Sequence, residues 1–492
     1  MSQIKVDHLS FAYPGSYDNI FEDVSFQIDT DWKLGFIGRN GRGKTTFLNL
    51  LLGKYTYSGS ISTPVSFSYF PFSIENKSIC TEEVIGSVCF GFPRWMLIRE
   101  LKFLDVPEAV LYRPFDTLSP GEQTKVMLAA LFLDEDRFLL IDEPTNHLDT
   151  GGRKLVSEYL QSKHGFILVS HDRAFLDGCV DHILSINKTD IELQQGNFSS
   201  WFVNRERQDH FETAENEKLK KQITRLQQSA REKADWSDAV EKTKYGTKNS
   251  GLRPDRGYLG HKAAKMMQRS KSITKRQQDA IEEKSQLLKN TERAEDLKVS
   301  QRPYHALRLL SLNKVTVSYG ERTVCENVSF SVERGDRTAL LGKNGSGKSS
   351  ILKLICGQDI PYSGVLQRGS GLEISYISQD TSFLRGSLSE YSEESGIDES
   401  LFKTILRKLD FERIQFEKDM RDFSGGQKKK VLIAKSLCEK SHLLIWDEPL
   451  NYVDVISRMQ IEALLLSYKP TILFVEHDRT FTEKIATKIV WL

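Results

Sequence analysis

The stretch Gly38-Arg-Asn-Gly-Arg-Gly-Lys44-Thr45 decides how this chain of 492 residues begins to fold. It has the spacing of a P-loop, whose glycines let backbone N–H groups turn toward phosphates at the start of a helix. The stretch Gly342-Lys-Asn-Gly-Ser-Gly-Lys348-Ser349 repeats it. Two P-loops in one chain predict two phosphate-binding α/β units.

Three further motifs follow each P-loop in the same order. They are Ser119-Pro-Gly-Glu122, Asp142-Glu143 and Ser170-His171 in the first copy, and Ser424-Gly-Gly-Gln427, Asp447-Glu448 and Glu476-His477 in the second. The separation between the P-loop lysine and the serine differs by a single position between the copies. The separation between the serine and the aspartate is identical in both. This agreement in spacing predicts a tandem repeat rather than chance matches.

The repeat divides the chain into three parts. We predict a first nucleotide-binding domain over 1–203, which we call the first copy, and a second over 307–492, the second copy. Residues 204–306, the insertion, are rich in charged and amide side chains, with apolar residues such as Leu219, Ile223 and Leu226 at helical spacing. Because turn residues gather only near 245–260, we predict an antiparallel helical hairpin with its tip there; two separate surface helices are the alternative.

The charge of the insertion stands apart from that of the chain. The whole chain has a net charge of +1, whereas residues 218–276 carry 17 basic and 5 acidic side chains, a net +12. A solvated helix face is the ordinary explanation, but such faces usually mix both signs. With Trp236, Tyr245, Tyr258 and His261 near the tip, the pattern favours a nucleic-acid contact.

Composition narrows the class of protein further. Six scattered cysteines without a CxxC pair favour reduced thiols in a cytoplasmic protein over a disulfide framework or a zinc site. The N-terminal residues lack an apolar signal core, and no apolar run is long enough to span a bilayer, so we expect no membrane segment.

The motifs predict an ATPase with Mg²⁺. Lysines 44 and 348 supply charge to the phosphates, and each aspartate that ends an apolar strand can hold Mg²⁺ through water. Glu143 and Glu448 would polarise the attacking water, and His171 and His477 would reach the γ-phosphate; purely structural roles are the alternatives. The predicted phosphate-binding residues are Gly38, Asn40, Gly41, Gly43, Lys44, Thr45, Thr46, Gly342, Asn344, Gly345, Gly347, Lys348, Ser349 and Ser350. The predicted Mg²⁺ residues are Thr45, Asp142, Ser349, Gln379 and Asp447.

The serine-led segments are also capping boxes, so on local sequence alone they indicate ordinary helix starts. At this fixed distance before the aspartate, they resemble the signature motif of the ATP-binding cassette family. That resemblance implies two ATPs sandwiched head to tail, with Lys44 opposite Ser424 and Lys348 opposite Ser119. The signature residues carried over are Ser119, Gly121, Glu122, Ser424, Gly425, Gly426 and Gln427.

Over essentially its whole length the chain resembles the ABC-F group of ribosome-associated ATPases. Asp447-Glu-Pro-Leu-Asn-Tyr-Val-Asp454, Ala214-Glu-Asn-Glu-Lys218, Tyr245-Gly246 and Gln268-Arg-Ser-Lys271 are similar to the Lsa-type members, with Vga-type relatives next. The resemblance implies a monomer that binds the bacterial ribosome at the tRNA exit site, beside large-subunit rRNA and P-site tRNA. Its linker would dislodge lincosamides, pleuromutilins and streptogramin A compounds. A housekeeping ABC-F factor and, less favoured, a tandem transporter ATPase subunit are the alternatives.

The two copies differ at two places that bear on catalysis. Gln379 follows a strand where the family has its Mg²⁺- and water-sensing Gln, whereas the first copy reads Tyr69-Phe-Pro-Phe-Ser73 there. Pro120 stands where the second copy has Gly425, which removes one N–H donor. We therefore expect the two sites to differ in rate. Tyr13 and Tyr319 are candidates for stacking on adenine, with core or edge roles as the alternative.

Overall fold

The structure is a computed structural model that describes residues 2–14, 19–89, 91–134, 137–186, 191–242, 301–320, 322–411 and 413–492. The chain divides into a larger compact unit, Met1–Trp201 with Asp296–Leu492, and a smaller one, Phe202–Glu295. Both copies therefore lie in the larger unit.

The first copy is built on a six-stranded sheet of order β5-β6-β7-β3-β8-β9, parallel except for the antiparallel β8/β9 pair. A second, antiparallel sheet has the order β2-β1-β4. The strands of the first copy are β1 (Gln3–Phe11), β2 (Phe21–Asp29), β3 (Lys33–Gly38), β4 (Ser58–Ser62), β5 (Ser66–Phe70), β6 (Arg137–Asp142), β7 (Phe166–Val169), β8 (His182–Ile186) and β9 (Ile191–Gln195). Its helices are α1 (Lys44–Leu51), α2 (Thr81–Val88), α3 (Arg94–Phe103), α4 (Pro120–Leu131), α5 (Thr150–Gln161) and α6 (Arg173–Cys179).

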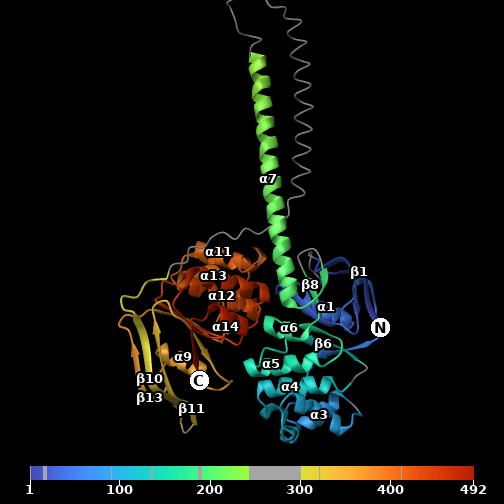
Figure 1. Ribbon diagram of the computed structural model, residues 1–492, viewed down its shortest axis with the longest axis vertical. Coiled ribbons are helices and arrows are strands. Elements are labelled where there is room, and N and C mark those ends of the chain that lie inside the picture. The colour runs from blue at the N-terminus through green and yellow to red at the C-terminus, as the bar shows by residue number, and fades with distance from the viewer. Residues whose placement is uncertain are drawn as a thin grey trace, which may run out of the picture. The chain divides into compact units, whose positions relative to one another are not determined.

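The second copy repeats this plan with a parallel five-stranded sheet, β14-β15-β16-β12-β17, and an antiparallel sheet, β11-β10-β13. Its strands are β10 (Arg308–Tyr319), β11 (Arg322–Glu333), β12 (Arg337–Leu341), β13 (Tyr362–Arg368), β14 (Ile374–Ile377), β15 (Leu443–Asp447), β16 (Ile472–Val475) and β17 (Lys488–Trp491). Its helices are α9 (Lys348–Ile355), α10 (Leu388–Glu394), α11 (Glu399–Lys408), α12 (Gly425–Cys438), α13 (Val455–Tyr468) and α14 (Arg479–Ile485), several of them drawn in orange and red in Figure 1.

Apolar burial explains why the central strands are parallel and fully covered. β7 reads Phe-Ile-Leu-Val and β16 reads Ile-Leu-Phe-Val, and every residue of both strands is buried. Such continuous apolar strands suit a parallel sheet with helices on both faces. Parallel strands bring their carboxyl ends to one edge, so the residues after β3, β6 and β7 meet there. The predicted α/β fold with two tandem nucleotide-binding domains is confirmed.

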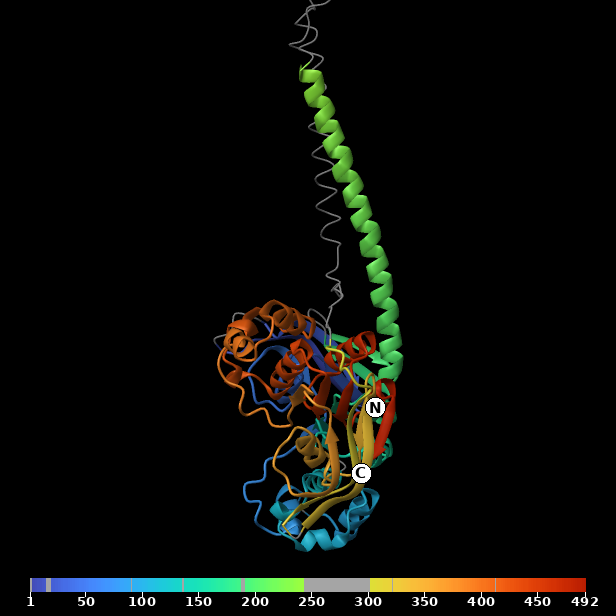
Figure 2. The ribbon, with the colours of Figure 1, turned by 90° about the vertical axis from the view of Figure 1, so that its left-hand side faces the viewer.

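The insertion begins as one helix, α7 (Phe198–Lys242), which is continuous in both views (Figure 1 and Figure 2). Phe198 and Trp201 are buried, so the helix starts inside the region predicted as the first domain. The packing of the second copy likewise starts before residue 307, since the Gln301 amide donates to the Thr471 carbonyl oxygen at 3.1 Å. The predicted tip over 245–260 and the return arm lie outside the described residues, so the hairpin stays a prediction.

Among the residues that the structure describes, no helix is long and apolar enough to cross a membrane.

Candidate nucleotide-binding sites

Each P-loop connects a buried strand to a helix, and the residue at the helix start is a glycine that no other residue could replace without strain. Gly43 and Gly347 are the N-caps of α1 and α9, with φ of 91° and 89°. A Cβ atom on Gly43 would lie 2.5 Å from the Ile20 side chain, and one on Gly347 would lie 3.0 Å from Val324. Both the backbone angle and the close packing therefore require glycine at this position.

The P-loop lysines are folded back over their own loops. Lys44 Nζ donates to the carbonyl oxygens of Gly38 at 2.7 Å and Arg39 at 3.1 Å. Lys348 Nζ donates to those of Gly342 at 2.9 Å and Lys343 at 2.8 Å. Burial lowers the pKa of both ammonium groups. Each ammonium group thus lies inside the loop that would bind phosphate, where phosphate oxygens can accept the same N–H groups.

A hydroxyl and a carboxylate lie together beside each lysine. Thr45 Oγ1 donates to Asp142 Oδ2 at 2.9 Å, and Ser349 Oγ donates to Asp447 Oδ1 at 3.1 Å. Oxygen ligands of this kind suit Mg²⁺, which normally also keeps water and substrate phosphate oxygens as ligands. The described residues hold no cluster of three His, Cys, Asp or Glu side chains that would bind a metal without the nucleotide. The donor set therefore fits a Mg²⁺ ion that arrives with phosphates.

The glutamate after each aspartate has a strained backbone. Glu143 has a φ of 51° and Glu448 a φ of 48°, in the left-handed region that non-glycine residues rarely occupy. Each backbone N–H donates to the last carbonyl of the neighbouring strand, Val169 at 2.9 Å and Val475 at 3.1 Å. Strain of this kind is typical of functional sites.

Three polar side chains surround Glu448. The amides of Gln379 and Asn451 donate to Glu448 Oε2 at 2.9 and 2.6 Å, and His477 Nε2 lies 3.5 Å from Oε1. Burial alone raises the pKa of Glu448, but hydrogen bonds from His477 and Asn451 outweigh it and hold the pKa below its ordinary value. This carboxylate is therefore ionised at neutral pH. Gln379, predicted as a Mg²⁺ residue, contacts the glutamate here.

The equivalent Glu143 has fewer hydrogen-bond donors around its carboxylate among the described residues. His171 Nε2 lies 3.4 Å from Glu143 Oε1 and 3.1 Å from Asn40 Oδ1. Burial, together with the neighbouring Asp142, raises the pKa of Glu143 to about 8. Burial and Lys44 hold the pKa of His171 well below its ordinary value, so the imidazole is neutral. The surroundings of the two glutamates thus shift their pKa values in opposite directions.

The strands that lie beside the two aspartates agree at one position and differ at another. Phe72 stands where the second copy has Gln379, so the first copy has no amide at this strand end. The Tyr69 hydroxyl donates to Asp142 Oδ2 at 2.9 Å, and Tyr376 occupies the equivalent position beside Asp447. Burial and Asp142 raise the pKa of Tyr69, so the phenol stays protonated and remains a donor to the carboxylate.

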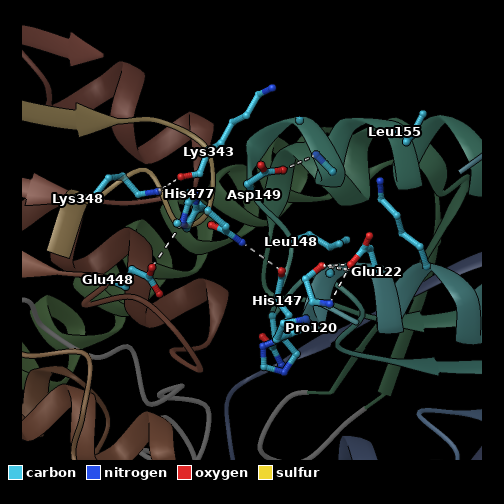
Figure 3. Close-up of a pocket in the computed structure, with 18 of the residues that line it drawn as sticks. Pro120, Glu122, His147, Leu148, Asp149, Leu155, Lys343, Lys348, Glu448 and His477 are labelled. Carbon is cyan, nitrogen blue, oxygen red and sulfur yellow. Dashed lines mark hydrogen bonds and ion pairs between the residues drawn. The ribbon is translucent and has the colours of Figure 1, made fainter. Parts of the chain in front are cut away.

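A cavity of about 990 Å³ lies between the copies, lined by residues of both. On one side are Lys348, Ser349, Gln379, Glu448 and His477 of the second copy, and on the other are Ser119, Gly121 and Glu122 of the first. Figure 3 shows Lys348, His477 and Glu448 across the cavity from Pro120 and Glu122. Ser119 caps α4, and its side chain and that of Glu122 form a capping box. This places the helix N-terminus where an anion is favoured.

The other predicted pair of motifs also meets across the copies. The Asn40 amide of the first P-loop donates to the Tyr452 carbonyl oxygen of the second copy at 2.7 Å. A Cβ atom on Gly426 would lie 2.7 Å from Asn40 Nδ2 and 2.3 Å from the Tyr452 carbonyl oxygen. Ser424 caps α12 in a capping box with Gln427, and Gly425 lies beside Tyr452. The second signature segment therefore packs closely against the first P-loop.

Tyr13 and Tyr319 occupy equivalent positions beside the P-loop helices. The Tyr13 hydroxyl is 2.8 Å from Thr46 Oγ1, and the Tyr319 hydroxyl is 3.2 Å from Ser350 Oγ. Their exposed fractions are 38% and 48%, so neither is a core residue and both present ring surface to solvent. Stacking on adenine remains a prediction for both.

Two contacts of the sites were not predicted from the sequence. Asn451 donates to the catalytic candidate Glu448, and Tyr69 donates to Asp142; both lie in segments quoted from the sequence, but neither was given a role there. The position of Tyr69 one strand away from Asp142 follows from the parallel pairing of β5 with β6, in which Phe70 lies opposite Ile141. Both positions are repeated in the two copies: Asn451 follows Glu448 at the same spacing as Asn146 follows Glu143, and Tyr376 is the counterpart of Tyr69.

Comparison with known families places this geometry in a familiar group. The family described as ABC transporter matches residues 21–85, 94–146 and 325–451, which covers the P-loop and aspartate of both copies. A solved structure of the archaeal ribosome recycling factor aABCE1 with stalk protein aP1 has a TM-score of 0.62 at 18% identity and covers 96% of this chain and 84% of that one. An RNase-L Inhibitor structure has the same TM-score and identity and covers 99% and 87%. At such identity these structures support the fold alone.

Relatives of known sequence align over nearly the whole chain. Ribosome protection protein VmlR of Bacillus subtilis (strain 168) is 30% identical over 480 residues, covering 96% of this chain and 84% of VmlR. ATP-binding protein Uup of Buchnera aphidicola is 26% identical and covers 99% and 80%. Probable ATP-binding protein YheS of Escherichia coli (strain K12) is 26% identical and covers 94% and 74%. With paired P-loops, signature segments and Asp-Glu motifs in one chain, it follows that this protein is an ATPase and belongs to the ABC-F family.

Proposed function

We propose that this ATPase binds the bacterial ribosome and protects it from antibiotics of the peptidyl-transferase centre. The observation that carries the proposal is the pairing of the two copies around shared sites, combined with a +12 insertion that belongs to neither copy. An insertion of that charge suits RNA, because binding to phosphates releases counterions. The similarity over 480 residues to a protein named for ribosome protection supports the target.

We propose the following division of roles among the residues of each site. Lys44 and Lys348 bind the phosphates of ATP, and the serine-led helix of the opposite copy completes the anion site. Thr45 with Asp142, and Ser349 with Asp447, hold Mg²⁺, which when bound neutralises developing phosphate charge. Glu143 and Glu448 orient the attacking water, while His171 and His477 lie against them.

The finer proposal concerns what ATP binding does. Closure of the copies on ATP would hold the protein at the tRNA exit site, with the insertion tip directed at the drug site and P-site tRNA. Hydrolysis would then release it. The drug classes expected from the resemblance are lincosamides, pleuromutilins and streptogramin A compounds.

The experiment that tests this uses a tip-shortened chain. Residues 248–258 are replaced by a short Gly-Ser turn, which removes reach of roughly 10 Å or more at ~1.5 Å per helical residue and ~3.3 Å per extended residue. The cassette residues that bind ATP are untouched, so ATPase activity and ribosome co-sedimentation should persist while drug protection in a growth assay is lost. Protection at the wild-type level in this variant would refute the role of the tip.

A housekeeping translation role is the second candidate, favoured by the similarity to proteins named only as ATP-binding, such as Uup and YheS. Growth of a deletion strain with and without each drug class separates the two. A defect without drug supports the housekeeping role, whereas a defect only with drug supports protection. Co-sedimentation with membranes instead of ribosomes would indicate the transporter ATPase alternative.

A further inference from the structure

A basic residue and an acidic residue recur at equivalent places in both copies, outside the predicted ATP-binding set. The second residue of each P-loop is basic, Arg39 in one and Lys343 in the other. The turn before each signature segment carries an aspartate, Asp105 after α3 and Asp410 after α11. In the head-to-tail pairing of the copies, each basic residue belongs to the same site as the aspartate of the opposite copy.

At the first site this pair is joined. Arg39 Nη1 lies 2.5 Å from Asp410 Oδ1, and their side chains are only 18% and 13% exposed. The ion pair links the first P-loop to the turn between α11 and the second signature segment. Because it is largely shielded from solvent, it is screened less than a surface pair would be.

The turn at Asp410 is in turn fixed to the signature helix. Lys430 of α12 donates to the carbonyl oxygen of Leu409 at 2.8 Å and pairs with Asp454 at 2.9 Å. Asp454 is the N-cap of α13, where its side chain accepts from the Ser457 N–H group. The ion pair between Arg39 and Asp410 is therefore connected through this turn to α12, the helix whose N-terminus faces the first P-loop.

At the second site the same four groups surround open space. Lys343, Asp105, Lys125 and Asp149, the counterparts of Arg39, Asp410, Lys430 and Asp454, all line the 990 Å³ cavity. Within the described part of the chain, no ion pair joins any two of these four side chains. The two sites thus show the same charges in two arrangements, one joined and one apart.

The backbone supports a role for the carboxylate itself. Asp105 and Asp410 have φ values of 52° and 63°, left-handed conformations just past a helix end. Glycine or asparagine normally takes such a position at little cost. Aspartate also tolerates this conformation, and both copies place a carboxylate at this position.

We propose that Arg39–Asp410 and Lys343–Asp105 are matched closing contacts, each of which forms when its site closes and positions the opposite signature helix over the P-loop. In this structure the pair at the first site is joined and the pair at the second is apart, although the Asn344 amide still donates to the His147 carbonyl oxygen across the second site at 3.4 Å. These four are positioning residues, since none is placed against the reacting atoms. The inference rests on the proposed sharing of each ATP site between the copies.

A charge-swap cycle in the full-length chain tests the contact at the first site. Arg39→Glu and Asp410→Arg each place like charges together, whereas the double variant restores an opposite pair. We expect each single variant to raise the ATP concentration for half-maximal hydrolysis about tenfold, with kcat changed much less, and the double variant to return within about threefold of wild type. Lys418→Glu, an exposed position on the second copy, is the matched control and should change neither value.

A second readout does not depend on hydrolysis. Hydrogen exchange of residues 409–427 is measured with a non-hydrolysable ATP analogue; protection should appear in wild type, fall in each single variant and return in the double. Where charge reversal impairs folding, Arg39→Gln and Asp410→Asn form the same cycle with smaller effects. Additive losses in the double variant, without recovery, overturn the inference.

The second site supplies the decisive comparison. Lys343→Glu with Asp105→Lys should show the same rescue, because the proposal requires that this pair forms on closure although it is apart here. Rescue at the first site alone would make Arg39–Asp410 a fixed contact and overturn the matched pair. If hydrogen exchange of the wild type shows no nucleotide-dependent protection at all, the proposal that the copies share the ATP sites is refuted. If protection appears but neither charge swap restores it, only the proposal of the closing contacts is refuted.

Discussion

The guanidinium of Arg173, in the first copy, forms a two-pronged ion pair with the carboxylate of Glu462 in the second. One prong joins Nη1 to Oε2 at 3.1 Å, the other joins Nη2 to Oε1, and both side chains are 5% exposed. The equivalent Arg479 behaves differently, pairing with Glu483 of its own helix at 2.7 Å on the surface. The reason is that Ser157 stands in the first copy where the second has Glu462.

Breaking the Arg173–Glu462 pair should destabilise the pairing of the two copies. Glu462→Gln leaves a buried guanidinium without its full charge partner, which costs about 3–5 kcal/mol and corresponds to a fall in melting midpoint on the order of 10 °C. Differential scanning calorimetry of the full chain measures it. Glu483→Gln, at the exposed Arg479–Glu483 pair, is the control and should leave the melting midpoint nearly unchanged. Equal shifts for the two variants would contradict the buried pair's importance.

Removing both catalytic candidates should trap the ATP-bound state. Glu143→Gln with Glu448→Gln keeps the phosphate-binding lysines but loses both water-orienting carboxylates, which should slow hydrolysis about 10²–10⁴-fold. We would measure the hydrolysis rate in steady-state ATPase assays, and we would measure ATP binding and co-sedimentation with ribosomes separately. We expect binding to persist and ribosome association to increase. Hydrolysis near the wild-type rate would exclude these glutamates as catalytic residues.

The single variants should differ from one another. Gln379 and Asn451 donate to Glu448 and His477 lies beside it, whereas His171 lies 3.4 Å from Glu143 and no described amide side chain donates to that carboxylate. Glu448→Gln should therefore remove more of the total turnover at pH 7 than Glu143→Gln does. Gln379→Phe, which copies the first site, should move the second site toward the lower rate. A larger loss from Glu143→Gln would reverse this ranking.

Glu100 predicts a specific pH dependence of stability. Burial alone raises the pKa of Glu100, but hydrogen bonds from Lys163, Tyr159 and Arg99 outweigh it, and the pKa is held below its ordinary value. A carboxyl with a lowered folded pKa stabilises the protein above its unfolded pKa, and this contribution is lost as the pH falls through the folded pKa. The melting difference between wild type and Glu100→Gln should thus be large at pH 7 and shrink below about pH 4. Exposed Glu158→Gln is the control, and a pH-independent difference would contradict the assignment.

Ribosome binding should weaken with salt. The +12 segment must displace counterions from RNA, at roughly 0.7–0.9 per phosphate contact. Neutralising Lys262, Lys265, Arg269 and Lys271 together should flatten the plot of log binding constant against log salt. These residues lie outside the described part of the chain, so the prediction rests on their charge alone. An unchanged slope would assign the charge to a solvated face.

The sequence was most informative where a motif needs a fixed backbone. The P-loop glycines, the capping boxes at Ser119 and Ser424, and the aspartates that end β6 and β15 were all predicted, because spacing alone determines where such residues lie on a strand or a helix end. The tandem α/β fold followed from the same repetition.

What could not be predicted depends on partners far away in the chain. Arg173 meets Glu462 across 289 positions, and Arg39 meets Asp410 on the opposite copy. No local pattern identifies such pairs. The opposite pKa shifts of Glu143 and Glu448 could not be predicted for the same reason, since they arise from the side chains that fold around each carboxylate.

The difference between Ser157 and Glu462 has a consequence for how the halves of this chain recognise each other. Two molecules of the first copy, placed face to face, would set the buried cation Arg173 against Ser157, a hydroxyl that already donates to the Phe175 carbonyl oxygen at 3.2 Å. In that assembly Arg173 would lose its two-pronged carboxylate partner and keep only the counterpart of Asp478, which lies 3.9 Å away, so burial of the cation disfavours the assembly. The first copy therefore pairs more favourably with the second copy of the chain than with another first copy. The two duplicated halves are complementary and not interchangeable.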